Sequence, residues 1–554
     1  MNKAMPIGVD DFKEIREQYY FVDKTDFIRQ LIDVHSKATL ITRPRRFGKT
    51  LTMSMLEYFF SIDRAKESDK LFHGLAIEKA GTKYMKYQGQ YPVIFISLKD
   101  IKNASWESML DQWGIFLRRL YLRYTYLCDS PAVDDGMKDD FSRIIKREST
   151  ENELAGALTR LMEIMQAYYG KPVILLIDEY DAPIQNAWED GFYDDCIRFM
   201  RHFLGSALKT NASLDFAVLT GVLRIAKESI FSGLNNLDVC SVMTDQYSDV
   251  FGFTPDEVSE IAAALQCSHM LPDIQAWYDG YRFGKADIYN PWSVINFFDK
   301  QTLADYWVNT SGNAILRQLM KQTDAEQKED LLSLLHGDSV TAVIREGVIY
   351  DDIGENPDAL YTMLLTTGYL TAIHKQSTFG GQLCRLVIPN REVKDAYRVE
   401  VLERMRGRLA ASSLLLMMED LVAGHVVPFS KTLERYIAYL VSSYDAANKE
   451  SFYHGFLLGM TALFVSEYVI ESNRESGYGR FDIAIFPKDT SKAGVLMEFK
   501  AADSESQLED KADEALRQIE EKQYVTEFEK RGILKVWKYG IAFCGKQVHV
   551  KMKI

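Results

Sequence analysis

The chain contains 554 residues, of which 47% are hydrophobic, and has a formal net charge of −14. This length predicts roughly two to four domains, and the acidic charge argues against a dedicated nucleic-acid binder, which usually carries a basic surface. No apolar run reaches the roughly 18 residues that span a bilayer, and residues 1–14 lack the apolar stretch of a signal peptide. We therefore expect a cytoplasmic protein without membrane contact, in which any contact with DNA is local or metal-assisted.

The first specific motif is TLITRPRRFGKT at residues 39–50, which an amphipathic helix pattern follows at once. A strand, a loop ending in Gly-Lys-Thr and a helix form the architecture of a phosphate-binding loop. We expect Lys49 to reach the β- and γ-phosphates and Thr50 to bind Mg²⁺. The general pattern has glycine where this chain has Arg43, so a basic turn between a strand and a helix remains an alternative. The predicted nucleotide-binding residues of the loop are Arg45, Arg46, Phe47, Gly48, Lys49 and Thr50.

A second motif, VILLIDEY at residues 173–180, predicts a buried strand that ends in two acids. In an ATPase site, Asp178 would hold Mg²⁺ and Glu179 would orient the attacking water. A core strand that ends in a solvated acidic turn is the alternative. The order of the two motifs along the chain favours the ATPase interpretation.

A third strand, DFAVLTG at residues 215–221, ends in a threonine. Thr220 fits a polar sensor of the γ-phosphate on a strand next to the acidic one. Arg224 follows it and is either an arginine sensor or finger, or a surface cation.

Alternation of apolar strands with helix patterns predicts a parallel α/β sheet that contains strands 39–42, 93–98, 173–177 and 215–220. From residue 254 onward the pattern turns helical. The aromatic segments 277–284 and 289–298 either stack on a base or pack beneath a loop, and we favour packing.

The C-terminal part contains a second set of chemically suggestive residues in ESGYGRFDIAIFPKDTSKAGVLMEFK, residues 475–500. Alternation predicts two strands, with Asp482 near the start of the first and Glu498 and Lys500 on one face of the second. The two acids would share a divalent ion, Mg²⁺ or Mn²⁺, and the lysine would orient water or stabilise phosphate charge. An edge hairpin with solvated charges is the alternative.

Further residues surround this predicted hairpin. Either Glu471 or Glu475 is a candidate for an additional acid before the first strand. A helix after the hairpin would place Gln518 and Tyr524 near the site. A short strand near residues 467–472 would complete an α-β-β-β-α-β order of elements in this part of the chain.

Taken together, RPRRFGKT, VILLIDEYD, YDGYRFG with YNPWSV, and GRFDIAI with VLMEFK resemble bacterial AAA-ATPase-like proteins fused to a PD-(D/E)XK nuclease-superfamily domain. The resemblance covers nearly the whole chain. It implies an α/β architecture with a P-loop ATPase core at residues 1–250, a mainly helical lid or middle region at 251–440 and a nuclease-like α/β domain at 441–554. It also implies ATP and Mg²⁺ at the first set of residues and a second metal at Asp482 and Glu498.

The function expected from this resemblance is an ATP-regulated, metal-dependent deoxyribonuclease, with a role in defence or in a mobile element by analogy only. One alternative is a binding switch whose nuclease-like domain is inactive and docks nucleic acid or protein. Another is a protein that binds ATP as a structural ligand without hydrolysing it. Related ATPases often use an arginine from a neighbouring subunit, so we expect a homo-oligomer; the possible donors are Arg201, Arg224 and Arg282.

Overall fold

The computed structural model places most of the chain in two compact units, which we describe separately. Unit 1 contains residues 1–322 and 341–393, and unit 2 contains residues 323–340 and 394–554. The residues that the structure describes are 4–224, 237–308, 316–317, 319, 323, 325–345, 347, 356–405, 411–440, 453, 457–458, 460–461, 467–472, 475–476 and 479–554. The predicted division into three domains remains a prediction.

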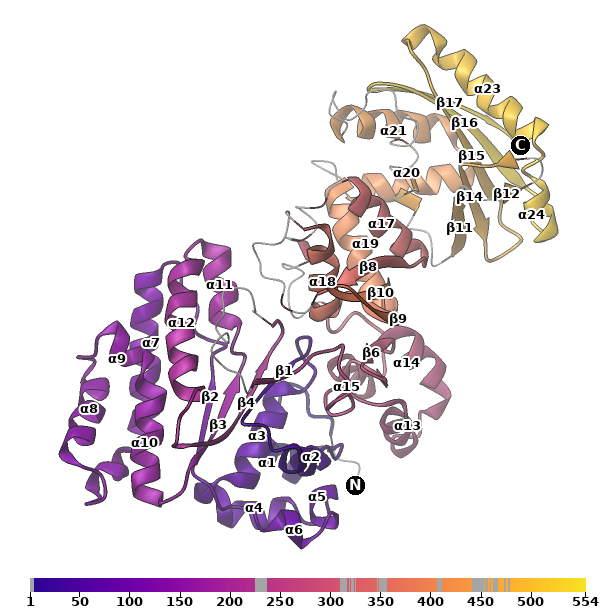
Figure 1. Ribbon diagram of the computed structural model, residues 1–554. Coiled ribbons are helices and arrows are strands. Elements are labelled where there is room, and N and C mark those ends of the chain that lie inside the picture. Colours follow the sequence, from indigo (N-terminus) through magenta and orange to yellow (C-terminus); the bar gives the residue numbers. More distant parts are fainter. Residues whose placement is uncertain are drawn as a thin grey trace. The chain divides into compact units, whose positions relative to one another are not determined.

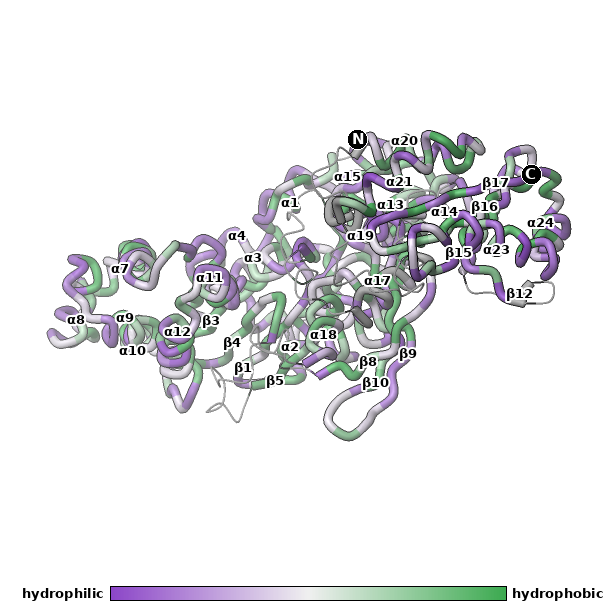
Figure 2. The backbone as a smooth tube through the Cα atoms, turned by 90° about the horizontal axis from the view of Figure 1, so that it is seen from above, coloured by the Kyte–Doolittle hydropathy of each residue, from purple (hydrophilic) through white to green (hydrophobic). Residues whose placement is uncertain are grey.

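The centre of unit 1 is a five-stranded parallel sheet, in the order β2-β3-β4-β1-β5. Its strands are β1 (Ala38–Thr42), β2 (Val93–Ser97), β3 (Val173–Asp178), β4 (Leu214–Gly221) and β5 (Leu237–Cys240). Every residue of β1 and β3 is buried, as expected for parallel strands covered on both faces, and β3 is coloured as hydrophobic in Figure 2. The four predicted strands are confirmed, and β5 is an additional one.

Helices cover both faces of this sheet (Figure 1). One face carries α3 (Lys49–Phe60), and the other carries α10 (Ala157–Tyr169) and α12 (Tyr193–Leu208). Because parallel strands meet with their carboxyl ends at one edge, residues that follow β1, β3 and β4 are brought together there. The other helices before residue 225 include α1 (Phe12–Gln18), α2 (Asp26–Val34), α4 (Ala65–Leu71), α5 (Ala76–Lys79), α6 (Thr82–Met85), α7 (Trp106–Leu122), α8 (Asp135–Lys146), α9 (Glu151–Ala155) and α11 (Ala182–Asp190).

The middle of the chain is largely helical and also contains two small sheets. Helix α13 (Pro255–Ala264) begins at a capping box in which Thr254 and Glu257 bond each other's backbone N–H groups. Its described helices continue with α14 (Leu271–Tyr278), α15 (Pro291–Lys300), α17 (Ala325–His336) and α18 (Pro357–Thr367). The sheets are a hairpin of β6 (Tyr281–Phe283) and β7 (Ala286–Ile288), and a three-stranded sheet of β8 (Val340–Ile344), β10 (Gly381–Val387) and β9 (Thr371–Thr378).

Unit 2 is built on a mixed five-stranded sheet, in the order β11-β14-β15-β16-β17. The strands are β11 (Tyr468–Ser472), β14 (Ile483–Pro487), β15 (Gly494–Ala501), β16 (Val536–Cys544) and β17 (Gln547–Lys553), and β12 (Glu475–Ser476) and β13 (Gly479–Arg480) form a separate short pair. Only β15 and β16 pair in parallel. The predicted hairpin of residues 475–500 is therefore the antiparallel pair of β14 and β15.

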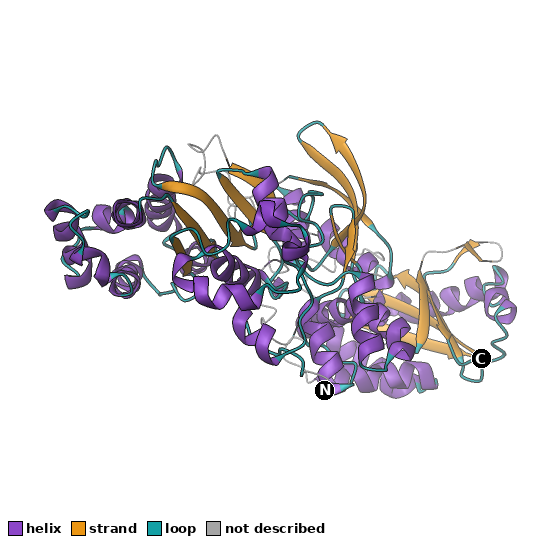
Figure 3. Cartoon of the chain, turned by 90° about the horizontal axis from the view of Figure 1, so that it is seen from below, coloured by secondary structure: helices purple, strands orange, loops and turns teal. Residues whose placement is uncertain are grey.

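Helices lie on both faces of the unit 2 sheet (Figure 3). One face packs against α20 (Ala411–Ala423) and α21 (Val426–Leu440), and the other packs against α23 (Leu508–Glu521) and α24 (Thr526–Lys530). Alternate residues of β15 separate accordingly: Met497 faces α20 and α21, whereas Leu496 faces α23. Glu498 therefore lies on the same face as α23. Helix α19 (Arg391–Met405) begins in unit 1 and continues into unit 2.

Within the described residues, no helix has both the length and the apolar character that crossing a bilayer requires.

Candidate functional sites

Three polar residues from different elements meet at the carboxyl edge of the unit 1 sheet. Asp178 is fully buried at the end of β3. The Thr50 hydroxyl donates to its Oδ2 atom at 2.7 Å, and the Thr220 hydroxyl donates to its Oδ1 atom at 2.5 Å. We call Lys49, Thr50, Asp178, Glu179 and Thr220 the phosphate-loop site.

The side chain of Lys49 is hydrogen-bonded within its own loop. Gly48 precedes α3 with φ of 84°, a conformation that favours glycine. Lys49 is buried, and its Nζ donates to the carbonyl oxygens of Arg43 at 2.9 Å and Pro44 at 2.8 Å. Burial lowers the pKa of Lys49, while the charges of Glu179 and Asp178 oppose that shift. The lysine is thus held inside the loop by neutral acceptors that a phosphate could replace.

Glu179 adopts a left-handed backbone conformation directly after Asp178, with φ of 51°. Such a φ is uncommon for a residue other than glycine, and it directs the chain sharply away from β3. The carboxyl lies partly exposed in the cavity described next. Burial raises its pKa, and the nearby Lys49 ammonium opposes the rise. A carboxyl placed in this way can act on water beside a bound phosphate.

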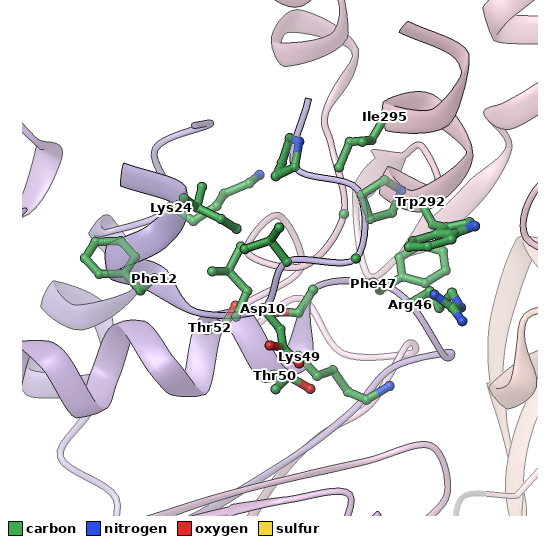
Figure 4. A pocket seen from close by; sticks show the side chains of 18 of the residues that line it. Asp10, Phe12, Lys24, Arg46, Phe47, Lys49, Thr50, Thr52, Trp292 and Ile295 are labelled. Carbon is green, nitrogen blue, oxygen red and sulfur yellow. Dashed lines mark hydrogen bonds between the residues drawn. The ribbon is translucent and has the colours of Figure 1, made fainter. Parts of the chain in front are cut away.

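A cavity of about 590 Å³ opens above the loop (Figure 4). Its wall contains the loop residues 45–50, Glu179, several residues of the segment 5–10, Lys24 and Trp292. This volume lies within the range of small-molecule sites. The amino end of α3 and Lys49 suit a phosphate chain, and the adjacent Thr50 hydroxyl and Asp178 carboxylate suit Mg²⁺. The residues present therefore fit a nucleotide with its metal ion.

Arg43, which stands where the general motif has glycine, has a structural role. Its side chain is fully buried and does not line the cavity. The guanidinium donates to the carbonyl oxygens of Cys240 at 2.9 Å and Tyr247 at 3.1 Å, and its carbon lies 5.0 Å from the centre of the Phe283 ring. This arginine ties the end of β1 to the end of β5 and to Tyr247, and its side chain does not face the cavity.

The three loop residues that follow Pro44 separate into two kinds. Arg45 donates to Gln185 Oε1 at 2.8 Å, and exposed Arg46 lies over the ring of Trp292 at 3.9 Å. Phe47 is fully buried, with its ring centre 5.0 Å from that of Tyr281. The side chain of Phe47 therefore packs in the interior, and its predicted contribution to nucleotide binding stays a prediction. Tyr281 belongs to the aromatic segments of the sequence and packs beneath the loop.

Two residues that the sequence interpretation overlooked hold the segment before Arg224. The Tyr180 hydroxyl donates to the Leu223 carbonyl at 2.7 Å, and Asp181 Oδ2 accepts from the backbone N–H groups of Val222 and Leu223, both at 2.9 Å. Burial raises the pKa of Asp181, and these two N–H donors oppose the rise. We call Tyr180 and Asp181 the strand clamp. The second aspartate in VILLIDEYD, Asp181, is the sequence feature that could have indicated the strand clamp.

The strand clamp also explains a glycine. A Cβ atom at Gly221 would lie 2.6 Å from the Tyr180 ring and 2.8 Å from Asp181 Oδ1. Only glycine allows the end of β4 to approach the turn after β3 this closely. Arg224, three residues later, is half-buried at the edge that carries Thr220.

In unit 2, the structure brings together the predicted Asp482, Glu498 and Lys500. Glu498 is 2% exposed, and Lys500 Nζ lies 3.5 Å from its Oε1 atom. Gln518 from α23 donates to the same Oε1 atom, and Asp482 Oδ2 accepts from the Phe499 N–H at 2.7 Å. We call Asp482, Glu498, Lys500 and Gln518 the acidic-pair site.

Lys500 compensates the buried Glu498 carboxyl of the acidic-pair site only in part. Burial and the charge of Asp482 raise the pKa of Glu498 to about 8, although Lys500 opposes the rise. Its second oxygen, Oε2, is buried and accepts no hydrogen bond within the described part of the chain. A divalent cation would use this oxygen and reduce the repulsion, so the two carboxylates fit a metal ion. Among the described residues no group of three or more His, Cys, Asp or Glu side chains surrounds a common point.

The additional residues predicted near this site have different outcomes. Glu471 forms an ion pair with Arg531 at 2.8 Å, so its carboxylate already has a cationic partner. The side chain of Glu475 lies outside the described residues. Gln518 and Tyr524 are both brought to the site, with 3.4 Å between Gln518 Nε2 and the tyrosine hydroxyl.

Comparison with known proteins gives two family matches. Residues 6–231 match the family model described as "Predicted AAA-ATPase", and residues 448–553 match the one described as "PD-(D/E)XK nuclease superfamily". The first range includes the whole phosphate-loop site and the second includes the whole acidic-pair site. A protein of Azotobacter chroococcum mcd 1, described as "Uncharacterized protein in vnfD 5'region", is 26% identical over 542 residues, which cover 96% of this chain and 94% of the relative.

Proposed function

Because this chain joins an AAA-ATPase-like domain to a domain of the PD-(D/E)XK nuclease superfamily, we propose that it is an ATP-regulated, metal-dependent deoxyribonuclease. The observation that carries the proposal is that each of two separate sites gathers complementary groups from distant parts of the sequence. One site suits a nucleotide with Mg²⁺, and the other suits a divalent cation, Mg²⁺ or Mn²⁺, beside a phosphodiester. The nucleic acid is proposed to be DNA.

The phosphate-loop site supports ATP hydrolysis through the placement of its own residues. Lys49 would exchange its carbonyl acceptors at Arg43 and Pro44 for phosphate oxygens. Thr50 and Asp178 would hold Mg²⁺, which neutralises phosphate charge when bound. Glu179, with its raised pKa, would take a proton from the attacking water.

The strand clamp favours Arg224 among the three arginines proposed to sense or stabilise the γ-phosphate. The backbone just before Arg224 is fixed by Asp181, whereas Arg201 and Arg282 have exposed side chains. Arg282 also lies 3.8 Å from Asp287. Whether the arginine acts within its own chain or on a second copy in a homo-oligomer can be tested by mixing Arg224→Ala with Lys49→Ala. Restored hydrolysis in the mixture requires action between subunits.

The acidic-pair site supports phosphodiester cleavage. Asp482 and Glu498 would hold the divalent cation, which when bound polarises the phosphate and lowers the pKa of water. Lys500 lies on the same face of β15 as Glu498 and would stabilise charge that develops on the phosphate. Gln518 orients the Glu498 carboxylate from α23.

The test measures cleavage of single-stranded, duplex and branched DNA with Mg²⁺ or Mn²⁺, with and without ATP. Wild type is compared with Glu498→Ala and Lys49→Ala, and ATP hydrolysis is followed in parallel. We expect Glu498→Ala to abolish cleavage and retain ATP hydrolysis, and Lys49→Ala to abolish the effect of ATP on cleavage. The controls are Lys66→Ala and Glu521→Ala, which replace exposed residues outside both sites.

The second candidate function is an ATP-driven binding switch whose nuclease-like domain does not cut. Two observations favour it: the net charge of −14, and the raised pKa of Glu498, which favours the protonated form of this carboxyl. Its mark would be ATP hydrolysis without cleavage of any of the DNA substrates, together with no binding of Mn²⁺ that depends on Glu498. RNA or a protein would then be the partner to seek.

A further inference from the structure

The phosphate loop is attached at successive residues to the middle of the chain. Arg46 lies over Trp292, Phe47 packs on Tyr281, and the Arg45 carbonyl accepts a hydrogen bond from the Trp307 indole N–H at 3.0 Å. All of these contacts lie within unit 1. A movement of the loop must therefore change contacts with residues 281–307.

Trp307 connects the loop to a buried carboxylate. Its side chain is 2% exposed, and its backbone N–H donates to Glu392 Oε1 at 2.5 Å. The same residue thus contacts the loop through its indole and Glu392 through its backbone. Such a two-sided residue can move only if both partners adjust.

Glu392 is a buried titratable group that neither candidate site uses. It is fully buried, and its Oε2 atom accepts from the Ser293 hydroxyl at 2.7 Å. Ser293 follows Trp292, which carries the Arg46 contact, so Glu392 receives both connections from the loop. Glu392 lies in the first turn of α19, the helix that begins in unit 1 and continues into unit 2.

The partners of the loop lysine are groups that a nucleotide could displace. Lys49 donates to the carbonyls of Arg43 and Pro44, the residues immediately before Arg45. A bound phosphate chain would compete for the same ammonium group and release those carbonyls. A loop whose lysine exchanges partners in this way would allow a ligand to shift a distant equilibrium.

We infer that Trp307 and Glu392 form a relay that transmits nucleotide occupancy of the phosphate loop to the first turn of α19, and through this helix to the unit that carries the acidic-pair site. The inference rests on the proposed function, because it names the route by which ATP would regulate that site. Trp307 and Glu392 are positioning residues and do not contact the nucleotide cavity.

The test follows hydrogen–deuterium exchange of the amides in residues 391–400 in the full chain, with and without Mg²⁺ and the non-hydrolysable analogue adenylyl-imidodiphosphate. In wild type we expect the analogue to change exchange there by about fivefold or more. Trp307→Phe keeps an aromatic ring but removes the indole donor, and we expect it to abolish this change while analogue affinity, measured by calorimetry, stays within about twofold. Glu392→Gln is the second variant and should reduce the change as well.

The matched control is Trp113→Phe. Trp113 is also fully buried in unit 1, and its indole N–H has no hydrogen-bond partner among the described residues, so the substitution makes the same chemical change outside the relay. It should retain the response of wild type. The relay is overturned if wild type binds the analogue without a change at residues 391–400, or if Trp307→Phe and Glu392→Gln both respond as wild type does.

Failure of the proposed function gives a different pattern. If DNA is not cleaved under any condition but the exchange response depends on Trp307, the relay stands and the nuclease assignment fails. If the analogue does not bind at all, the ATPase assignment and the relay fail together.

Discussion

The phosphate-loop site and the acidic-pair site both rest on a carboxylate at the end of a buried strand, but they differ in how that carboxylate is satisfied. Each oxygen of Asp178 accepts a hydrogen bond from a threonine hydroxyl. Glu498 has one oxygen with two neighbouring donors and one buried oxygen with no hydrogen-bond partner in the described chain. The carboxylate of the first site is thus hydrogen-bonded at both oxygens, whereas that of the second is hydrogen-bonded at one oxygen within the described chain.

This difference teaches how the two sites are prepared for their ligands. Hydroxyl donors around Asp178 hold the carboxylate in place and can rotate toward a metal ion at little cost. Asp482 near Glu498 instead adds repulsion that only a cation or a proton relieves. Loss of its ligand should therefore destabilise the acidic-pair site more than the phosphate-loop site.

The largest expected effect is that of Glu498→Gln, which removes the negative charge and keeps the shape of the side chain. We expect DNA cleavage to fall by about a thousandfold or more and Mn²⁺ affinity by about a hundredfold, because a carboxylate ligand is lost. Cleavage assays and Mn²⁺ titration calorimetry measure the two effects. Glu521→Gln, at an exposed position, is the control. Unchanged Mn²⁺ affinity in Glu498→Gln would show that Glu498 is not a ligand of the metal ion.

Glu392 supplies a reference for both sites, because it is a buried carboxyl with hydrogen-bond donors and belongs to neither site. Burial raises its pKa to about 7, from an ordinary value of 4.5. The folded state then binds more protons than the unfolded state between these values, so stability falls as pH rises from about 4.5 to about 7. Relative to Glu392→Gln, we expect wild type to lose up to about 3 kcal/mol over this range.

Chemical denaturation at pH 4.5, 5.5 and 7.5 measures this loss, with the transition of unit 1 followed separately where two transitions are resolved. The contribution is fully present below pH 4.5 and is lost above pH 7. A free-energy difference between wild type and variant that does not depend on pH would contradict the expected shift.

Glu179→Gln examines the other half of the comparison. The substitution preserves size and removes the base, so we expect the turnover number for ATP hydrolysis to fall by about a hundredfold with little change in ATP affinity. Coupled-enzyme kinetics and a nucleotide-binding titration measure these quantities. DNA cleavage without ATP should remain at the level of wild type. If hydrolysis continued at the rate of wild type, another group would have to activate the water.

The smallest expected effect concerns the strand clamp. Gly221→Ala would place a Cβ atom against Tyr180 and Asp181, and we expect a loss of about 2 kcal/mol in the free energy of unfolding from overpacking. The matched control is Gly205→Ala in α12, where, apart from the chain neighbours and the helix's own backbone, no atom of the described residues lies within 4 Å of the added carbon. That change should be neutral or slightly stabilising, by up to about 1 kcal/mol. Equal effects of the two substitutions on the free energy of unfolding would contradict the role of the strand clamp in positioning Arg224.

The sequence predicted those parts of the molecule whose signals are local. The apolar runs of β1 and β3 and the alternation of β14 are strong enough to locate strands, and parallel pairing then brings Thr50, Asp178 and Thr220 together. The two-residue spacing of Glu498 and Lys500 likewise predicts one shared face. In both sites, adjacency follows from strand geometry.

Contacts that depend on the packing of distant elements were not predictable in the same way. Nothing local in the sequence shows that Arg43 bonds the carbonyls of Cys240 and Tyr247, or that Arg531 pairs with Glu471. The connection of Trp307 to Arg45 joins residues more than 250 positions apart. Such pairs become visible only when the elements that carry them have been placed.

Because Arg43 is buried, replacing it with the glycine of the general motif would have structural consequences. A glycine at position 43 would improve the textual match to other phosphate-binding loops, yet it would leave two interior carbonyl groups without their donor and open a void the size of an arginine side chain. Arg43, the residue that departs from the motif, therefore supports the structure of the loop. Sequence searches that penalise an arginine at this position would miss chains in which a buried arginine supports the loop in the same way.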